Sequence, residues 1–494
     1  MDINRQSEAF FHLKDKWFFR KSSLLIIGFL LMILSDMRGS AGIFAWFVPI
    51  PLLIYVTLYR GVKNHLWLLL GLIAGAILTF MKAASVSLVF SVVFALMIGA
   101  VIGLRYFLVF LVWGYIRKRA GDFIGIIAFP SLIVILEYFQ AFYTPFGDWG
   151  SLANTQLYNL PLLQTASLFG FMGISALMSW AAVLLTSIVL KGSLANRKFQ
   201  LSIFILVLTV LYVFGDLRLD TVPKGKQIFA AGIMSEDKFT GVMPSPDDPE
   251  VLQNTDKLIE KTLKAAQSGA SIAVWGEGST MVSEKGEGTF LDTLSELAKT
   301  NNISIVAAYA VIRDKEQPFL NKFTWIQNNG EIAETYLKNH PVPGEGSEQG
   351  TAPLKVVHTE YGNMAGAICY DYDFPQMALT HARLGADLVV LPGMDWRGML
   401  RRHTLMSRIR AIEGGFSLLR PANGATSMGF DNLGQIRASM TDFGDNDKIL
   451  LATLPLERTN TLYSRIGNLI AYIAILALIY SLIMMGSNSR SVKK

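Results

Sequence analysis

The chain has 494 residues, of which 52% are hydrophobic and only 17% are charged, against about 25% charged residues in an ordinary soluble domain. This composition excludes a wholly water-soluble protein, and the single cysteine, Cys369, excludes an internal disulfide. The net charge of +6 lies largely in short loops between apolar runs, which membrane topology explains better than nucleic-acid binding does.

Long uncharged runs crowd residues 23–216 and 464–486, which predicts a polytopic α-helical membrane domain joined to one large water-facing domain. We expect eight spans, near 23–34, 41–58, 65–84, 86–115, 122–143, 165–190, 200–216 and 464–486. The first run is short for a bilayer core about 30 Å thick. The run at 86–115 holds no Pro, Asn or Asp that would make a turn, so we predict one long tilted or protruding helix there.

The short loops alternate between basic and nearly neutral, and this alternation predicts the orientation. The basic segments are the N-terminus, the loops at 60–63, 117–119 and 191–198, and the tail at 490–494. Because cytoplasmic loops collect Lys and Arg, both termini are expected in the cytoplasm and the large domain outside. The predicted parts are a seven-span transmembrane domain at 1–222, an extracytoplasmic domain at 223–458, and a C-terminal transmembrane helix with a cytoplasmic tail at 459–494.

Two charged residues, Arg105 and Glu137, fall inside otherwise apolar spans. Charges at such positions are costly and usually face a polar cavity or a partner. For Arg105 the alternative is snorkelling toward the interface, whereas Glu137 favours a structural role or one in a lipid cavity. The loop at 145–156 either lines a lipid entrance or is a plain connection.

From about Lys226 to Glu457 the pattern is that of alternating strands and helices, which suggests βαβ units. The predicted strands are 228–233, 271–274, 303–311, 322–327, 364–369, 388–391, 416–420 and 449–453. The predicted helices are 253–268, 289–300, 376–384 and 403–414, the first with apolar residues at helical spacing.

Three stretches of this domain carry residues suited to chemistry. Cys369 ends an apolar strand and precedes a helix, Glu277 stands near the end of a buried strand, and Lys338 follows a strand-like segment. Strand ends are where α/β sheets present reactive side chains, although a lone cysteine is often only a buried structural thiol. A Pro/Gly loop after Lys338 carries a second acid, Glu345.

Together these stretches resemble the Glu-Lys-Cys triad of the nitrilase, or carbon–nitrogen hydrolase, superfamily, and the membrane flanks resemble the apolipoprotein N-acyltransferase family. The shared motifs are the acid after a tryptophan at 275–277, Tyr-x-Lys at 336–338, Val-Pro-Gly-Glu at 342–345, Cys-Tyr-acid followed by Phe-Pro at 369–375, and the Arg-Ala-x-Glu helix with the next strand at 406–424. The resemblance implies a four-layer α-β-β-α sandwich. It also implies catalytic roles for Glu277, Lys338 and Cys369, with support from Glu345, Tyr370 and Asp371.

The resemblance also implies a reaction. A thiol with a pKa near 8.5 needs a base, a positive charge or both to attack a carbonyl. Glu277 would take the proton and Lys338 would stabilise the thiolate and the oxyanion. The implied acyl donor is a phospholipid, the implied acceptor is the N-terminal amine of a diacylglyceryl-cysteine lipoprotein, and the implied site is the periplasmic face of a bacterial inner membrane. No motif suggests a metal or another cofactor, and no nucleic acid is expected as a partner.

Several positions depart from the family pattern. Asp371 stands where the family usually has Glu, Gly276 replaces a proline, the loop at 342–345 lacks a Phe after its proline, and residues 393–397 replace Asn-Asp-Ala-Trp-Phe. Because these positions surround the expected pocket, they bear on the substrate more than on the class of reaction. The alternatives are therefore a membrane-anchored amidase, an acyltransferase for another amine, or a non-catalytic module that binds lipid or a partner.

Overall fold

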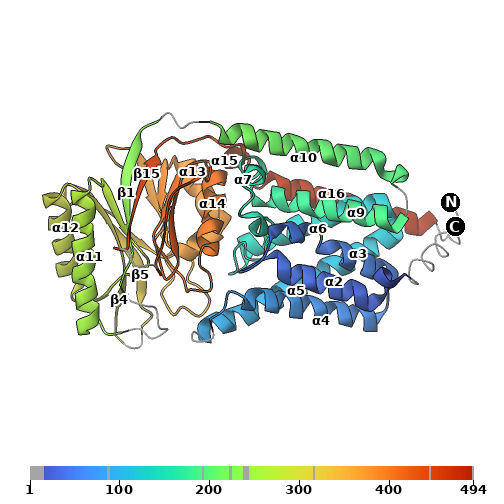
Figure 1. Cartoon of the computed structure of the whole chain (residues 1–494), viewed down its shortest axis with the longest axis horizontal. Coiled ribbons are helices and arrows are strands. Elements are labelled where there is room, and N and C mark those ends of the chain that lie inside the picture. Colours follow the sequence, from blue (N-terminus) through green and yellow to red (C-terminus); the bar gives the residue numbers. More distant parts are fainter. Residues whose placement is uncertain are drawn as a thin grey trace. The chain divides into compact units, whose positions relative to one another are not determined.

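The computed structural model describes residues 16–85, 89–191, 194–221, 225–236, 244–314, 317–443 and 447–491. The chain divides into two compact units, which are described one at a time (Figure 1). The helical unit comprises Met1–Gln140, Trp149–Leu217 and Asn468–Lys494, and the sheet unit comprises Ala141–Asp148 and Arg218–Gly467. The basic residues among 1–15 and 492–494, on which part of the predicted orientation rests, lie outside the described residues.

The helical unit is built from long apolar helices joined by short turns. Its main helices are α2 (Lys21–Ser35), α3 (Pro49–Leu58), α4 (Val62–Met81), α5 (Val89–Ala120), α6 (Asp122–Tyr143, whose last residues belong to the sheet unit), α9 (Phe171–Lys191), α10 (Lys198–Leu219) and α16 (Leu469–Ser491). The short turns are η1 (Trp17–Phe19), η2 (Gly42–Trp46), η3 (Ala153–Gln156), α7 (Leu160–Leu163), α8 (Ala166–Phe169) and η4 (Ala195–Arg197). As predicted for the run at 86–115, α5 is one continuous helix with no internal turn.

Six of the described helices, α4, α5, α6, α9, α10 and α16, are long and apolar enough to cross a membrane. The chain is therefore a multi-pass membrane protein. The first two expected spans are shorter: α2 has 15 residues, a rise of about 22 Å at 1.5 Å per residue, and α3 has 10 residues after a 3-10 turn. The count of eight spans stays a prediction.

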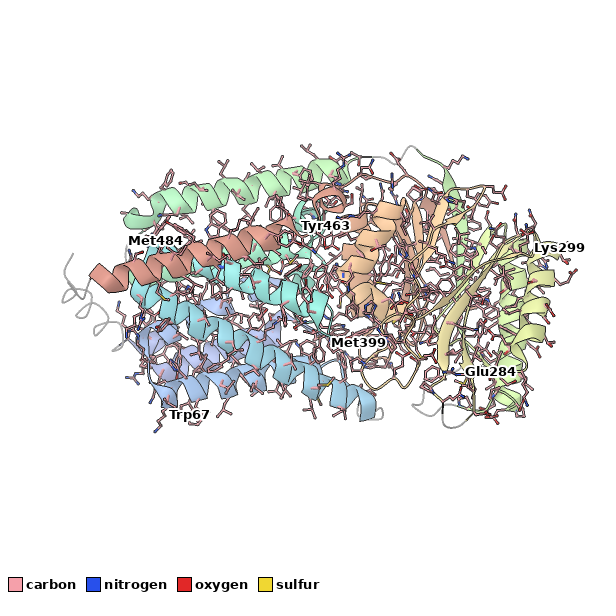
Figure 2. All side chains as sticks on the ribbon, turned by 180° about the vertical axis from the view of Figure 1, so that it is seen from behind. Trp67, Glu284, Lys299, Met399, Tyr463 and Met484 are labelled. Carbon is pink, nitrogen blue, oxygen red and sulfur yellow. The ribbon has the colours of Figure 1, made fainter. Side chains whose placement is uncertain are left out.

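Large apolar side chains cover the outside of the helical unit, as a lipid-facing surface requires. Trp67 on α4 is 53% exposed at the outer surface of its helix, and Leu206 on α10 and Leu476 on α16 are exposed as well. On the sheet unit the labelled surface residues are instead the charged Glu284 and Lys299 (Figure 2). This contrast follows the composition of the two parts of the chain, because only hydrocarbon tolerates so much exposed apolar area.

Arg105 and Glu137 both point into the helical unit. Arg105 is buried and donates to the Gln140 side chain and, at 2.8 Å, to the carbonyl of Gly150. Glu137 Oε1 accepts from the backbone N–H of Leu152 at 2.9 Å. The two charges thus hold the segment at 150–152, and this burial does not fit the snorkelling alternative for Arg105.

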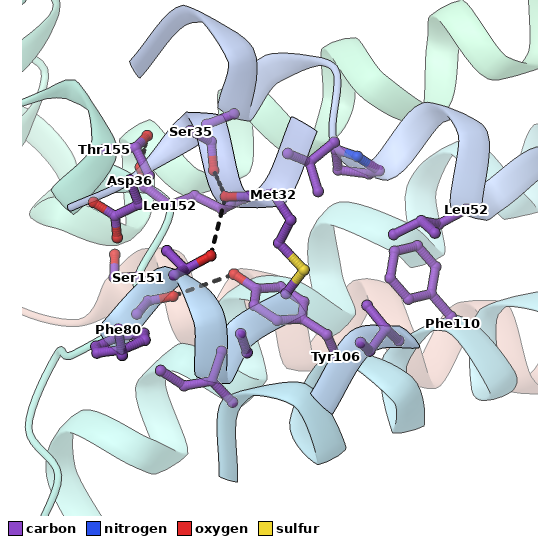
Figure 3. Close-up of a pocket in the computed structure, with 18 of the residues that line it drawn as sticks. Met32, Ser35, Asp36, Leu52, Phe80, Tyr106, Phe110, Ser151, Leu152 and Thr155 are labelled. Atoms are coloured by element: carbon purple, nitrogen blue, oxygen red, sulfur yellow. Dashed lines mark hydrogen bonds between the residues drawn. The ribbon is translucent and has the colours of Figure 1, made fainter. Parts of the chain in front are cut away.

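A pocket lies among α2, α3, α4, α5 and the segment at 150–155 (Figure 3). Its walls are mainly apolar, including Leu52 and Phe110, while Asp36, Ser151 and Thr155 gather at one end. The pocket is the kind of apolar chamber with a few polar groups that ligands occupy.

The sheet unit contains two mixed sheets. The first has the order β15 (Ile449–Pro455), β1 (Gln227–Ile233), β2 (Ile272–Trp275), β4 (Ser304–Ile312), β5 (Leu320–Ile326), β6 (Ile332–Leu337), with β3 (Met281–Ser283) paired to β4. The second has the order β14 (Ile436–Thr441), β13 (Thr426–Phe430), β11 (Ser417–Arg420), β9 (Leu388–Val390), β8 (Asn363–Gly366), β7 (Val357–His358). A further short pair joins β10 (Gly393–Met394) to β12 (Ala422–Asn423).

Helices cover the outer face of each sheet (Figure 1). Helices α11 (Pro249–Gln267) and α12 (Glu287–Thr300) pack on the first sheet, and α13 (Pro375–Leu384) and α14 (Arg402–Gly414) pack on the second; α15 (Leu462–Ile466) contacts α13 and α14. Leu258 and Ala265 of α11 lie in one core cluster with Trp275 of β2, because apolar residues at helical spacing form a stripe that must be buried. The predicted α-β-β-α sandwich is confirmed.

The predicted strands of this unit form with shifts of one or two residues at most ends. The largest difference is at the strand before Cys369. The strand expected at 364–369 stops at Gly366, and Cys369 begins a 3-10 turn, η5 (Cys369–Asp373). Strands β13 and β14 were not predicted. Residues 426–441 are rich in Ser, Thr and Gly and hold no continuous apolar run, so sheet pairing rather than local pattern forms them.

Candidate active site

Cys369 is held in a sharp turn just beyond the end of β8. Its backbone N–H donates to the carbonyl of Pro392 at 2.8 Å, and its φ of +44° lies in the left-handed region. Non-glycine residues rarely adopt that conformation, and where they do the strain often marks a functional position. The thiol is 4% exposed, so burial alone does not separate a reactive thiol from a structural one, and its neighbours must decide.

Glu277 and Lys338 reach one another from two strands of the first sheet. Glu277 follows β2 and Lys338 follows β6, and Lys338 Nζ donates to Glu277 Oε1 at 2.7 Å. Both side chains are buried. Burial lowers the pKa of Lys338, but Glu277 and Glu345 hold that pKa well above its ordinary value, so the ammonium is fixed.

Glu345 is the second partner of this ammonium rather than a surface acid of its loop. Its Oε2 accepts from Lys338 Nζ at 2.7 Å and from the N–H of Val342 at 2.8 Å. Asn321 on β5 donates to both carboxylates, Glu277 Oε1 and Glu345 Oε1, at 2.8 Å each. Burial raises the pKa of Glu345, yet Lys338 and Asn321 bring the pKa below its ordinary value.

The backbone of Met394, on the short strand β10, contacts both the Glu277 carboxylate and the Cys369 thiol. Its N–H donates to Glu277 Oε2 at 2.9 Å, and its carbonyl accepts from the Cys369 thiol at 3.6 Å. Glu277 and Cys369 therefore contact the backbone of the same residue, one at its N–H and the other at its carbonyl. The structure brings together Glu277, Lys338, Glu345 and Cys369, which lie far apart in the sequence.

The two residues after the cysteine, Tyr370 and Asp371, hold the surrounding segments in place through hydrogen bonds. Asp371 is fully buried and accepts from the Tyr336 hydroxyl at 2.8 Å and from the N–H groups of His340 at 2.7 Å and Ile368 at 2.9 Å. The Tyr370 hydroxyl donates to the carbonyl of Pro145 at 2.9 Å. Asp371 thus ties the turn to the strand and loop that carry Lys338.

The segment at 145–148, which follows α6 in the chain, packs on the turn that holds the cysteine. The N–H of Asp148 donates to the carbonyl of Asp373 at 2.9 Å. Arg410 of α14 is buried between Asp148 Oδ2 and Glu413 Oε2, at 2.6 Å from each. Within the sheet unit this segment thus contacts the turn that carries Cys369.

A second ionised cluster contacts the thiol and was missed at the level of sequence. Arg420 Nη2 donates to Cys369 Sγ at 3.3 Å and to Asp395 Oδ2 at 3.1 Å. His403 Nδ1 lies 2.7 Å from Asp395 Oδ1, and its Nε2 lies 3.0 Å from both carboxylate oxygens of Asp373. The only available signal was an arginine at the end of the apolar strand 416–420, since a charge in a buried strand needs a partner.

These charges set the acidity of the thiol. Burial and the carboxylate of Glu277 raise the pKa of Cys369, while Arg420 and His403 lower it, and the balance leaves the pKa above its ordinary value. The carboxylates of Asp373 and Asp395 hold the pKa of His403 well above its ordinary value despite burial, so both ring nitrogens carry a proton. At neutral pH the cysteine is a thiol that must lose its proton during attack.

Among the described residues, Cys369, Asp395 and His403 bring one sulfur, one oxygen and one nitrogen within 4.8 Å of one another, as a metal-ligand set would. Arg420 Nη2 lies 3.3 Å from the sulfur, 3.1 Å from Asp395 Oδ2 and 3.1 Å from His403 Nδ1. The guanidinium thus contacts all three groups, and His403 is itself a cation, so we assign the cluster as an ion-pair network.

Both units of the chain match known protein families. Residues 240–463 match the carbon-nitrogen hydrolase family, and residues 28–184 match the N-terminal domain of apolipoprotein N-acyltransferase. The chain is 27% identical over 391 residues to the apolipoprotein N-acyltransferase of Geobacter metallireducens, covering 72% of this chain and 73% of that one. It is 23% identical over 385 residues to that of Shewanella oneidensis, covering 69% and 70%. An amidase from Nesterenkonia sp. aligns in structure with a TM-score of 0.41 and 19% identity, over 51% of this chain and 97% of that one.

Proposed function

The chain belongs to the apolipoprotein N-acyltransferase family, as a distant member, and from that membership we propose that it transfers a fatty acyl chain from a phospholipid, through a Cys369 thioester, to the N-terminal amine of a diacylglyceryl-cysteine lipoprotein. The observation that carries the proposal is that Glu277 and Cys369 both contact the backbone of Met394, at its N–H and its carbonyl, while Lys338 donates to Glu277. A carboxylate, an ammonium and a thiol in one buried cluster are the groups that acyl transfer through sulfur needs.

In the first half-reaction Glu277 takes the thiol proton as the sulfur attacks the ester carbonyl of the phospholipid. A base is needed because burial holds the Cys369 pKa above its ordinary value. The S–C bond forms, the C–O bond breaks, and the departing lysophospholipid oxygen receives the proton. Lys338, a fixed cation, stabilises the negative charge on the carbonyl oxygen.

In the second half-reaction the lipoprotein amine attacks the thioester carbonyl. The N–C bond forms, the C–S bond breaks, and a proton from the nitrogen returns to the sulfur through Glu277. The amide is more stable than the thioester, so the transfer runs forward. Glu345 holds Lys338 in place through both steps, and Asp371 holds the loop that carries Lys338.

The alternative is a membrane-anchored amidase or an acyltransferase for another amine. It is favoured by one observation: Met394, whose backbone contacts both Glu277 and Cys369, belongs to the segment 393–397, which departs from the family's usual residues. A changed segment beside the sulfur changes which acceptor fits. It does not change the attack on a carbonyl.

The test combines the purified full chain, phospholipid and a synthetic diacylated lipopeptide, and weighs the lipopeptide by mass spectrometry. The proposal expects one added acyl chain, linked as an amide. A lipopeptide that keeps its mass, together with release of free fatty acid or with acylation of a different added amine, would favour the alternative.

We also propose that the sheet unit lies on the periplasmic side of the inner membrane, as the loop charges predict. Asp247 stands in an exposed turn before α11 and is a suitable place for a reporter. A reporter inserted there that is active only outside the cytoplasm should give a signal. Activity of a cytoplasmic reporter at this position would reverse the orientation.

A further inference from the structure

Arg420 is a cation in direct contact with the Cys369 sulfur. Its Nη2 lies 3.3 Å from Sγ, and the whole side chain is buried at the end of β11. Nη1 donates to Thr404 Oγ1 at 2.7 Å, and both terminal nitrogens donate to Asp395 Oδ2 at 3.1 Å. With these bonds the guanidinium is fixed against the sulfur before any substrate arrives.

His403 completes this cluster from α14. Its two ring nitrogens face the carboxylates of Asp395 and Asp373, so the ring is an imidazolium that neutralises one of them. Arg420 and His403 carry two positive charges and Asp395 and Asp373 carry two negative ones, so the cluster is neutral as a whole. Both cations of the cluster reach the sulfur: the guanidinium at 3.3 Å, and the His403 side chain through a hydrogen bond that lowers the pKa of the thiol.

Lys338 is less suited to balance a charge on the sulfur. Its ammonium lies 2.7 Å from each of two carboxylates, Glu277 and Glu345, and that group carries one net negative charge. When the thiol proton passes to Glu277, this group becomes neutral, because Glu345 alone then balances the ammonium, so it has no positive charge to spare for the sulfur. The balancing charge must come from another side, and Arg420 is in contact there.

We propose that Arg420 is a further catalytic residue, which stabilises the Cys369 thiolate through direct contact, and that Asp395 is the positioning residue that holds the guanidinium against the sulfur. The catalytic role of Arg420 rests on the proposed acyl transfer. Its stabilisation of the Cys369 thiolate does not depend on that reaction. All charged groups of the site enter the balance: Glu277, Lys338, Glu345, Asp373, Asp395, His403 and Arg420.

Arg420 acts in both half-reactions. In the first it stabilises the sulfur as its proton passes to Glu277 and before the S–C bond forms. In the second it stabilises the sulfur as the C–S bond breaks and the electron pair returns to the sulfur, which is then protonated again. A leaving thiolate with a lower pKa departs faster, so the contact favours attack by an amine on the thioester.

The test uses the thiol itself, because Cys369 is the only cysteine and alkylation by iodoacetamide reports on it alone. Only the thiolate reacts, so below the thiol pKa the rate follows the thiolate fraction. At pH 8, Arg420→Gln should slow alkylation about tenfold or more, since one pKa unit is tenfold in thiolate. Arg420→Lys, which keeps the charge, should restore part of the rate.

Asp395→Asn should change the rate in the opposite direction. This substitution keeps the size of the side chain and an oxygen that can accept from Arg420, so the guanidinium stays in place. It removes a negative charge close to the sulfur, so alkylation should become faster. Damage to the fold would not produce opposite shifts from two neighbouring residues. The control is Arg437→Gln, which breaks another guanidinium–carboxylate pair of the sheet unit, with Asp431, and should leave the rate unchanged.

The proposal is overturned if Arg420→Gln alkylates at the wild-type rate, or if Arg420→Gln and Asp395→Asn shift the rate in the same direction. Because alkylation needs neither phospholipid nor lipopeptide, failure of the proposed acyl transfer would not affect this result. Where transfer is seen, single-turnover decay of the thioester after addition of lipopeptide should be slower in Arg420→Gln than in wild type. An equal decay rate would confine the role of Arg420 to thiolate formation and contradict its role in the second half-reaction.

Discussion

Lys338 Nζ lies as close to Glu345 Oε2 as it does to Glu277 Oε1, at 2.7 Å from each. One ammonium thus holds two carboxylates, and Asn321 donates to both of them. Glu277 is kept in contact with the N–H of Met394, while Glu345 anchors the ammonium from its loop. This division of labour predicts different consequences for the two acids.

Replacing the nucleophile should abolish transfer without loss of fold. Cys369→Ala removes the sulfur, and Cys369→Ser offers a hydroxyl that is far less acidic than a thiol, so both should lower acyl transfer by about 10³-fold or more. With wild-type chain and phospholipid, intact mass spectrometry should find one acyl chain on Cys369 that hydroxylamine releases. A wild-type transfer rate in either variant would remove Cys369 from the mechanism.

Removing the second counter-ion of Lys338 should lower activity while the chain stays folded. Glu345→Gln leaves the ammonium paired only with Glu277, so Lys338 moves toward that carboxylate and away from the position of the oxyanion. We expect a loss of about ten- to a hundredfold in kcat. The matched control is Glu348→Gln in the same loop, whose half-exposed carboxylate pairs with Arg313 and should not affect transfer.

The same residue should make stability depend on pH. Because Lys338 and Asn321 bring the pKa of Glu345 below its ordinary value, this carboxylate stabilises the fold above its unfolded pKa, and the contribution is lost as the pH falls through its folded pKa. Wild type should therefore unfold at a higher temperature than Glu345→Gln at pH 7, and the gap should narrow at pH 3. A gap that widens on acidification would contradict the sign.

The buried pair Arg410–Asp148 should be costly to break. Arg410 is 1% exposed and lies 2.6 Å from Asp148, so Asp148→Ala takes one of its carboxylate partners from a buried guanidinium. Breaking a buried ion pair by removing one partner costs about 3–5 kcal/mol. The melting temperature should fall, and hydrogen exchange should rise in residues 144–149.

The control for this variant is Glu260→Gln, whose exposed carboxylate pairs with Lys264 on the same helix and should leave both measurements unchanged. If Asp148→Ala melts at the wild-type temperature, the segment at 145–148 is not held by this pair.

Local pattern predicted much of the sheet unit. The strand that precedes Glu277 is predicted from a short apolar segment, whereas Lys338 is only seen to follow a strand-like segment. The helix after Cys369 begins at a proline, Pro375, that starts helices readily. The strand before Cys369 was drawn too long, because Ala367 and Ile368 are apolar and nothing local marks where pairing with β9 stops. The loop acid Glu345 could be identified, but its bond to Lys338 could not.

The sequence by itself determined which segments are apolar, which alternate as strands and helices, and which residues with reactive side chains follow a strand, because hydrophobic period and turn residues act over a few positions. Only the tertiary structure decided that Arg420, His403, Asp395 and Asp373 meet at the Cys369 sulfur. These residues come from a strand end, a helix, the position after a two-residue strand and a 3-10 turn, and no local rule relates them. Their charges pair because the two sheets and α14 exclude water there, and an unpaired charge in such surroundings is costly.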